Sequence, residues 1–296
     1  MSLIASILLI AQVGPYTLPN PGGSAPRIPP PALEGREPKP RPSTTVPARP
    51  VLRPALQNCY ALAESDPTEA LVSADDALAG KSGEAMADPL ACKAIALLAL
   101  DRWKEAQDAF IAARDALPQT EMATRAELEA GAAIAAEGQG QFQSALDMFN
   151  RAQAQARQSG NTALAGRIAR DKANSLFRLG RKAEAAASLN EARAALPTDA
   201  PTLLLSARMA RITGKLDEAQ GFIERAAAVA PLDAEVGLEG GLIAALAGRD
   251  DAARKSWQSV IATAPGTNEA RQAQAWIAQL GPPAPQTAAK PAPAGN

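Results

Sequence analysis

An internal repeat restricts the possible folds of this chain more strongly than any other feature of its sequence. The repeat can be followed in five copies from five alanines, which are Ala106, Ala145, Ala185, Ala219 and Ala253. Each has Ala or Gly twelve residues before it and Ala or Val seven residues after it. Four residues after each stands a large apolar residue: Phe110, Phe149, Leu189, Ile223 or Trp257. Residues four and seven apart share one face of an α-helix, so each copy predicts an amphipathic helix.

Breaking residues occur at fixed positions around these helices. Five residues before the alanine stands Gly in four copies and Asp101 in the first. Twelve residues after it stands Pro in four copies and Arg157 in the second. Gly readily adopts the left-handed conformation that ends a helix, and Pro prevents a helix from continuing. Each copy is therefore predicted to contain two helices, with a turn at the Gly and a stop at the Pro.

Composition also favours helices over strands. Hydrophobic residues make up 47% of the chain, but aromatic residues make up only 3%, so Ala and Leu supply most of the apolar content. Alanine has the highest helix propensity, whereas strands are enriched in β-branched and aromatic residues. One helix pair cannot bury its apolar face alone, so we expect successive pairs to stack, with Phe110, Phe149 and Trp257 filling the seams.

This pattern resembles the tetratricopeptide-repeat (TPR) family. The last three copies are 34 residues apart, which is the family's period, and the two earlier spacings are 39 and 40 residues. A degenerate copy centred on Ala70 lies 36 residues before Ala106. We expect the extra residues to lengthen the turns near 120–125 and 158–163. The resemblance implies an all-α, right-handed solenoid of about five to six helix-turn-helix units. The predicted solenoid spans 55–280, with a degenerate unit at 55–84, full units at 87–120, 126–159, 166–199, 200–233 and 234–266, and a capping helix at 267–280.

The two ends of the chain differ from the repeats. An uncharged apolar run at 3–11 is too short to cross a bilayer, which needs about 20 apolar residues. It predicts a signal peptide at 1–13, although the basic flank is missing, and hence a periplasmic or secreted protein. A cytoplasmic protein with an uncleaved N-terminal helix is the alternative. Proline density predicts disordered segments at 14–54, which holds thirteen prolines, and at 281–296.

The residues present argue against several classes of function. The chain has no histidine and only two cysteines, so it lacks the commonest general base and a set of metal ligands. The net charge of −1 gives no field that would attract nucleic acid. Glu127, Glu129 and Glu137 are interpreted as surface carboxylates. We therefore predict no catalytic residues, no metal, no cofactor, no nucleic-acid partner and no membrane span.

The two cysteines are predicted to lie close together. Cys59 and Cys92 are 33 residues apart, nearly one repeat, so they fall at similar positions on adjacent first helices. In an oxidising compartment they could form a disulfide, which would stabilise the weakest unit. Two buried, reduced thiols are the alternative, because free Cys is among the most buried residue types.

The resemblance implies that the first helices line a concave groove that binds extended peptides or helices. A polar stripe is predicted there, and its members are Arg167, Arg170, Asn174 and Arg178. Phe177 flanks the stripe, and Arg208 and Arg211 continue it on the next first helix. Arginine suits the recognition of carboxylates, so the partner segment is predicted to carry acidic residues between apolar ones. Arg170 and Asn174 are similar to the start of a carboxylate clamp, but Leu205 stands near the position of its second Asn. The alternative is a solvated face with ordinary ion pairs.

These patterns together predict a non-catalytic scaffold or adaptor of the cell envelope that binds other proteins or peptides. A cytoplasmic TPR scaffold is the first alternative. A helical-repeat enzyme of the cell wall, similar to the superhelical lytic transglycosylases, is an alternative from another class. Such enzymes carry their catalytic Glu in a separate domain, for which the chain has no long segment outside the repeats.

Overall fold

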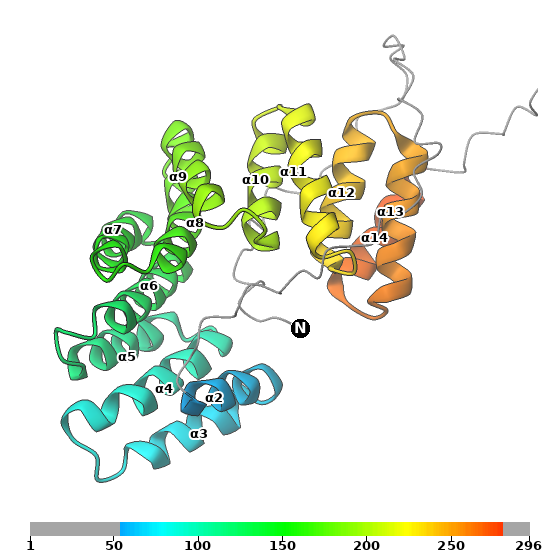
Figure 1. The fold of residues 1–296 in the computed structure, drawn as a ribbon. Helices are drawn as coiled ribbons and strands as arrows, with labels where there is room; N and C mark the ends of the chain where they lie inside the picture. Colours follow the sequence, from blue (N-terminus) through cyan, green and yellow to red (C-terminus); the bar gives the residue numbers. More distant parts are fainter. Residues whose placement is uncertain (1–53, 281–296) are drawn as a thin grey trace, which may run out of the picture. The chain divides into compact units, whose positions relative to one another are not determined.

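The computed structural model describes residues 54–280, in which every regular element is a helix (Figure 1). The predicted signal segment, almost all of the Pro-rich arm and the tail lie outside the described residues. The α-helices are α2 (Pro54–Ser65), α3 (Pro67–Leu78), α4 (Ala87–Ala99), α5 (Trp103–Ala116), α6 (Met122–Gly138), α7 (Phe142–Gln158), α8 (Thr162–Arg178), α9 (Lys182–Ala195), α10 (Ala200–Ile212), α11 (Leu216–Val229), α12 (Ala234–Leu246), α13 (Asp250–Thr263) and α14 (Asn268–Leu280). A short 3-10 helix, η1 (Gly83–Met86), precedes α4. The predicted all-α repeat architecture is confirmed.

The chain divides into two compact units, whose border falls inside α10 between Thr202 and Leu203. In the first unit, each helix from α2 to α8 packs against the helix that follows it. The pairs α4 and α5, α6 and α7, and α8 and α9 can be followed as successive hairpins in Figure 1. The second unit contains the pair α12 and α13, the preceding helix α11 and the final helix α14, with the rest of α10.

The repeated small and large apolar residues form the core. The five anchoring alanines are fully buried, and Phe110, Phe149, Leu189, Ile223 and Trp257 are each at most 5% exposed. The first helix of each pair needs a small residue where the large apolar residue of the second helix packs against it. A Cβ atom added to Gly241 would lie 2.1 Å from the indole nitrogen of Trp257, which is closer than any side chain could tolerate. The spacing therefore reflects close approach of the two helices in each pair.

The turn inside each repeat has the same backbone conformation in all five copies. Gly140, Gly180, Gly214 and Gly248 adopt positive φ angles of 75°, 77°, 79° and 71°. Asp101 takes the same place with φ of 57° and is the only non-glycine residue between 54 and 280 with positive φ. The amide of Arg102 donates to the carbonyl of Leu97 at 2.9 Å, which is the long hydrogen bond of a Schellman helix ending. Aspartate tolerates this conformation better than most residues.

The extra residues of the early repeats lengthen helices, which corrects the prediction of longer turns. Helices α6, α7 and α8 each have 17 residues, whereas α4 has 13 and α5 has 14. Helix α7 continues to Gln158 because Arg157 stands where other copies have Pro, and Gly160, whose φ is 74°, lies in the turn that follows. Helices α6 and α8 accordingly begin at Met122 and Thr162, before the predicted unit starts at 126 and 166.

Candidate protein-binding groove

A cavity of about 260 Å³ lies in the first unit among the first helices of its repeats. Its walls come mainly from α2, α4, α6 and α8, the first helices of four successive repeats, and Phe110 of α5 also lines it. We call this cavity the groove. Most of its lining is apolar, and side chains that form this part include Ala63, Ala91, Ile95, Leu98, Leu128 and Ile134. Ala91, Ile95 and Leu98 of α4 follow one another at spacings of four and three residues, so they share one face of that helix.

Two predicted arginines line the groove, and both are engaged in ion pairs. Arg167 lies 3.8 Å from a carboxylate oxygen of Glu127 on α6. Arg170 Nε donates to Asp171 at 2.8 Å, and its Nη1 lies 3.4 Å from Asp199 in the turn after α9. Burial opposes the charge of Arg170, but the two carboxylates outweigh it and raise the pKa of its guanidinium. The two arginines that line the groove therefore already have carboxylates of this chain beside them.

The remaining members of the α8 stripe do not line the groove. Asn174 donates to Glu137 Oε2 at 3.3 Å, and Arg178 stacks on Phe142 with 4.7 Å between its Cζ atom and the ring centroid. Phe177 is half-buried. These contacts join α8 to α6 and α7, so they hold repeats together.

Arg208 and Arg211 belong to the second unit. Arg208 Nη2 pairs with Glu235 at 3.0 Å, and Arg211 Nε donates to the buried Glu239 at 2.5 Å. Both glutamates lie on α12, so the two arginines join α10 to α12. Their predicted place beside the α8 stripe stays a prediction.

The interpretation of Glu129 as a surface carboxylate is wrong, whereas Glu127 and Glu137 are half-buried. Glu129 is 2% exposed, and it binds Arg114 of α5 and Arg151 of α7, with 2.6 Å between Arg151 Nη2 and Glu129 Oε1. Burial raises the pKa of Glu127, although Arg167 opposes this. Burial also raises the pKa of Glu137 to about 7, because its hydrogen bonds from Ser175 and Asn174 only partly offset the loss of water.

Glu137 gives a prediction about pH. Its pKa is about 7 in the folded protein and near the ordinary 4.5 in the unfolded chain, so the folded state binds the proton more tightly. Stability from this group is fully present below about pH 4.5 and is lost as pH rises through 7. Glu137→Gln keeps the shape without the charge, so it should raise the free energy of unfolding relative to wild type at pH 8 and change it much less at pH 5. Urea unfolding followed by circular dichroism at both pH values measures the difference.

The matched control is Glu184→Gln, because Glu184 is exposed and its hydrogen bond from Arg181 lowers its pKa. The free energy of unfolding of this variant should not exceed that of wild type at pH 8. An equal effect of Glu137→Gln at the two pH values would contradict the raised pKa.

The stacked helix pairs, the buried alanines and the recurring glycine turn have counterparts among solved structures. The structure is similar to PilW, a widely conserved type IV pilus biogenesis factor, with 20% identity and a TM-score of 0.60 over 74% of this chain and 96% of that one. A thermophilic TPR protein of Thermus thermophilus, TTC0263, matches with 19% identity and a TM-score of 0.53, over 65% of this chain and 98% of its own. This chain has the TPR fold.

Other comparisons add to this picture of the TPR chain. PilF of Pseudomonas aeruginosa matches with 16% identity and a TM-score of 0.54, over 75% of this chain and 96% of that one. No protein-family model matches the sequence. No curated protein sequence matches it either. The fold assignment therefore rests on the three-dimensional arrangement.

Several lining residues of the TPR groove were missed by the sequence reasoning, chiefly those of α6. Thr124, Glu127, Gly131 and Ile134 all line the groove. Their spacings of three, four and three residues place them on one face of α6, and this periodicity was a usable signal. It was obscured because the irregular spacing of the early repeats shifted the predicted start of this unit to 126, beyond Thr124.

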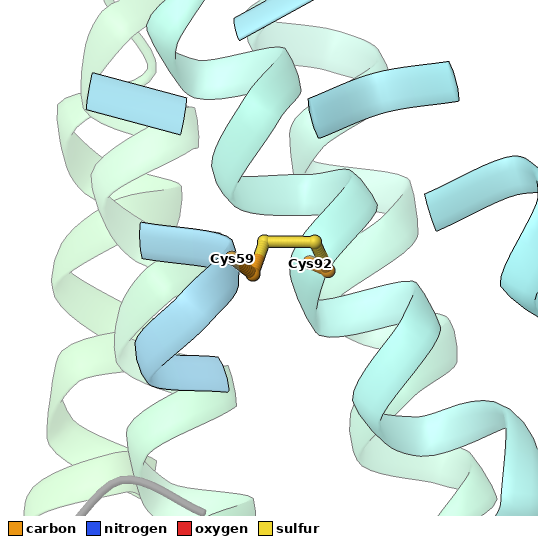
Figure 2. Close-up of a disulfide and its surroundings, with 2 residues drawn as sticks. All are labelled: Cys59 and Cys92. Atoms are coloured by element: carbon orange, nitrogen blue, oxygen red, sulfur yellow. A yellow bond between two sulfur atoms is a disulfide. The ribbon is translucent and has the colours of Figure 1, made fainter. Parts of the chain in front are cut away.

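The structure contains a disulfide between Cys59 of α2 and Cys92 of α4, with 5.7 Å between the Cα atoms (Figure 2). The bond joins the first helix of the TPR array to the first helix of the next repeat. Helix α2 also contributes Tyr60, Ala63 and Glu64 to the groove. The disulfide thus fixes one wall of the groove to its neighbour.

Other classes of site have no candidate in the described part of the TPR chain. Among residues 54–280, no group of three or more Cys, Asp or Glu side chains is arranged to hold a metal ion. Over the same range, no helix combines the length and the apolar character needed to cross a membrane. The groove is therefore the candidate site within these residues.

Proposed function

We propose that this protein is a non-catalytic scaffold whose first unit binds a segment of a partner protein in the groove. The observation that carries the proposal is the apolar cavity itself, which four successive first helices build from residues such as Ile95, Leu98 and Ile134. Apolar side chains of a partner would leave water on entering it, which is a favourable process roughly proportional to the apolar area removed from water. Concave, largely apolar sites of this kind are typical places for ligands.

The distribution of charges around the groove bears on the partner's composition. Arg167 and Arg170 were predicted to bind acidic side chains, but each already has a carboxylate of this chain beside it. An acidic partner would have to displace Glu127 or Asp171. The acidic character of the partner stays a prediction, and these ion pairs argue against it.

We place the scaffold in the cell envelope. The Cys59–Cys92 disulfide fits an oxidising compartment, and the structurally similar PilW is a type IV pilus biogenesis factor. The predicted signal segment lies outside the described residues, and N-terminal sequencing of the mature protein would test its cleavage. An uncleaved N-terminus together with reduced cysteines in cells would favour the cytoplasmic alternative.

The enzyme alternative has no specific observation in its favour. Glu137 has a strongly raised pKa, which is a frequent property of catalytic acids. It does not line the groove, however, and its carboxylate is bound by Ser175 and Asn174 of α8. We therefore assign Glu137 a structural role between α6 and α8.

A pair of matched variants tests the groove as the binding site. Ile134 lines the groove and is half-buried, whereas Val72 on α3 is 50% exposed and lies outside it. The partner is captured from native cells with the wild-type protein and then purified. Ile134→Glu should raise the Kd for this partner at least about tenfold, because a charge would replace part of the apolar lining. Val72→Glu makes the same chemical change and should bind normally. Isothermal titration measures both, after circular dichroism has shown intact helices; equal binding by the two variants would contradict the proposal.

A further inference from the structure

The size of the groove limits what can enter it. Its volume of about 260 Å³ is below the range of roughly 300–1,000 Å³ that is common for sites enclosing a whole small molecule. It can accept a few side chains, while the partner's backbone must lie across its mouth. The occupant is therefore a segment that presents apolar side chains on one side.

The lining also indicates the backbone conformation of that segment. The wall is mostly apolar, and the charged groups Arg167 and Arg170 already have carboxylate partners. An extended segment lying across the mouth would turn part of its backbone N–H and C=O groups toward this mostly apolar wall, which offers them few hydrogen-bond partners. A helix satisfies its backbone groups internally, so it can lay an apolar face on the same wall.

The charges of the lining favour a basic residue in the partner. Three carboxylates, those of Glu64, Glu127 and Asp171, line the groove together with the guanidinium groups of Arg167 and Arg170. Glu127 and Asp171 lie beside these arginines, whereas Glu64 forms no ion pair with any residue in the described range 54–280. Glu64 is exposed, and Tyr60 one turn earlier on α2 also lines the groove. A Lys or Arg of the partner would complement the exposed carboxylate of Glu64.

Resting on the proposed function, we infer that the groove binds an amphipathic helix of a partner protein, with apolar side chains in the cavity and a Lys or Arg against Glu64. The apolar part provides the attraction, and the charge fixes the orientation of the helix. This occupant differs from an extended Pro-rich segment, which cannot form the helix, and from an acidic segment, which Glu64 would repel.

Selection from a displayed library of random peptides long enough for about four helical turns tests the inference on the full, oxidised chain. Peptides recovered on wild type should repeat apolar residues at spacings of three and four, lack internal Pro and carry Lys or Arg. A recovered peptide, synthesised and titrated, should gain helical circular dichroism on binding. Glu64→Lys should weaken its Kd by about fivefold, because attraction becomes repulsion, and should favour acidic peptides when the selection is repeated.

The control is Glu84→Lys, which makes the same change of charge at an exposed residue of η1 outside the groove and should leave the Kd unchanged. Two kinds of failure can be distinguished. If recovered peptides bind Ile134→Glu as well as wild type, or none is recovered, the proposed function fails. If binding needs Ile134 but the peptides contain Pro, stay non-helical or are indifferent to Glu64→Lys, the inference is overturned and the groove stands.

Discussion

Replacing both cysteines by alanine is expected to lower the free energy of unfolding of the first unit by about 3–4 kcal/mol. The disulfide closes a loop with a sequence separation of 33, and removing it gives the unfolded chain more conformational freedom. Helix α2 and its partner α3 begin the described array, so they have stacked repeats on one side only. Thermal unfolding followed by circular dichroism, and hydrogen exchange of the amides of α2 and α3, measure the loss.

Reduction of the wild-type protein should reproduce the effect of the double replacement. Treatment with a thiol reductant should shift the wild-type transition down and leave the double variant unchanged, which separates the lost bond from side-chain effects. Because Tyr60, Ala63 and Glu64 of α2 line the groove, the reduced protein should also bind the groove peptide more weakly. A wild-type transition that does not move on verified reduction would show that the disulfide contributes little to stability.

Trp257→Ala is expected to lower the free energy of unfolding by about 3–5 kcal/mol in the second unit. Trp257 is completely buried, packs against Gly241, and lies 5.3 Å from Trp276 of the final helix between ring centroids. Its indole N–H donates to the carbonyl of Leu238 at 3.0 Å. Truncation leaves a large cavity and removes this side-chain hydrogen bond between α13 and α12. Urea unfolding, with hydrogen exchange resolving α12 and α13, measures the effect.

Two further variants check the cause of that loss. Trp257→Phe keeps an aromatic ring but removes the N–H donor. It should lower the free energy of unfolding too, but by about 1–2 kcal/mol less than Trp257→Ala does. Leu232→Ala truncates an apolar side chain that is 72% exposed in the same unit and should change stability little. If Trp257→Ala were no worse than Leu232→Ala, the seam residue would not hold the repeats together.

Two glutamates of α6 show how much helical periodicity alone can predict. Glu129 and Glu137 each lie four residues from Ala133, the small core residue of α6, so they share its buried face. That spacing was available, but its meaning depended on partners elsewhere in the chain. Glu129 binds Arg151, 22 residues later, and Glu137 binds Ser175, 38 residues later. A carboxylate on such a face is interpretable only once its neighbours are known.

The helices, their turns and the residues that fill the seams could be predicted from the amino-acid order, because they depend on short spacings within one helix pair. Asp101 could be placed in the glycine position, and Trp257 in the core, from their offsets alone. The groove, the pairing of Arg167 with Glu127 and the lengthening of α6 to α8 became visible only in the folded chain. These features depend on which faces of different repeats come into contact. Short spacings within one helix pair do not determine those contacts, because they form only when the repeats pack against one another.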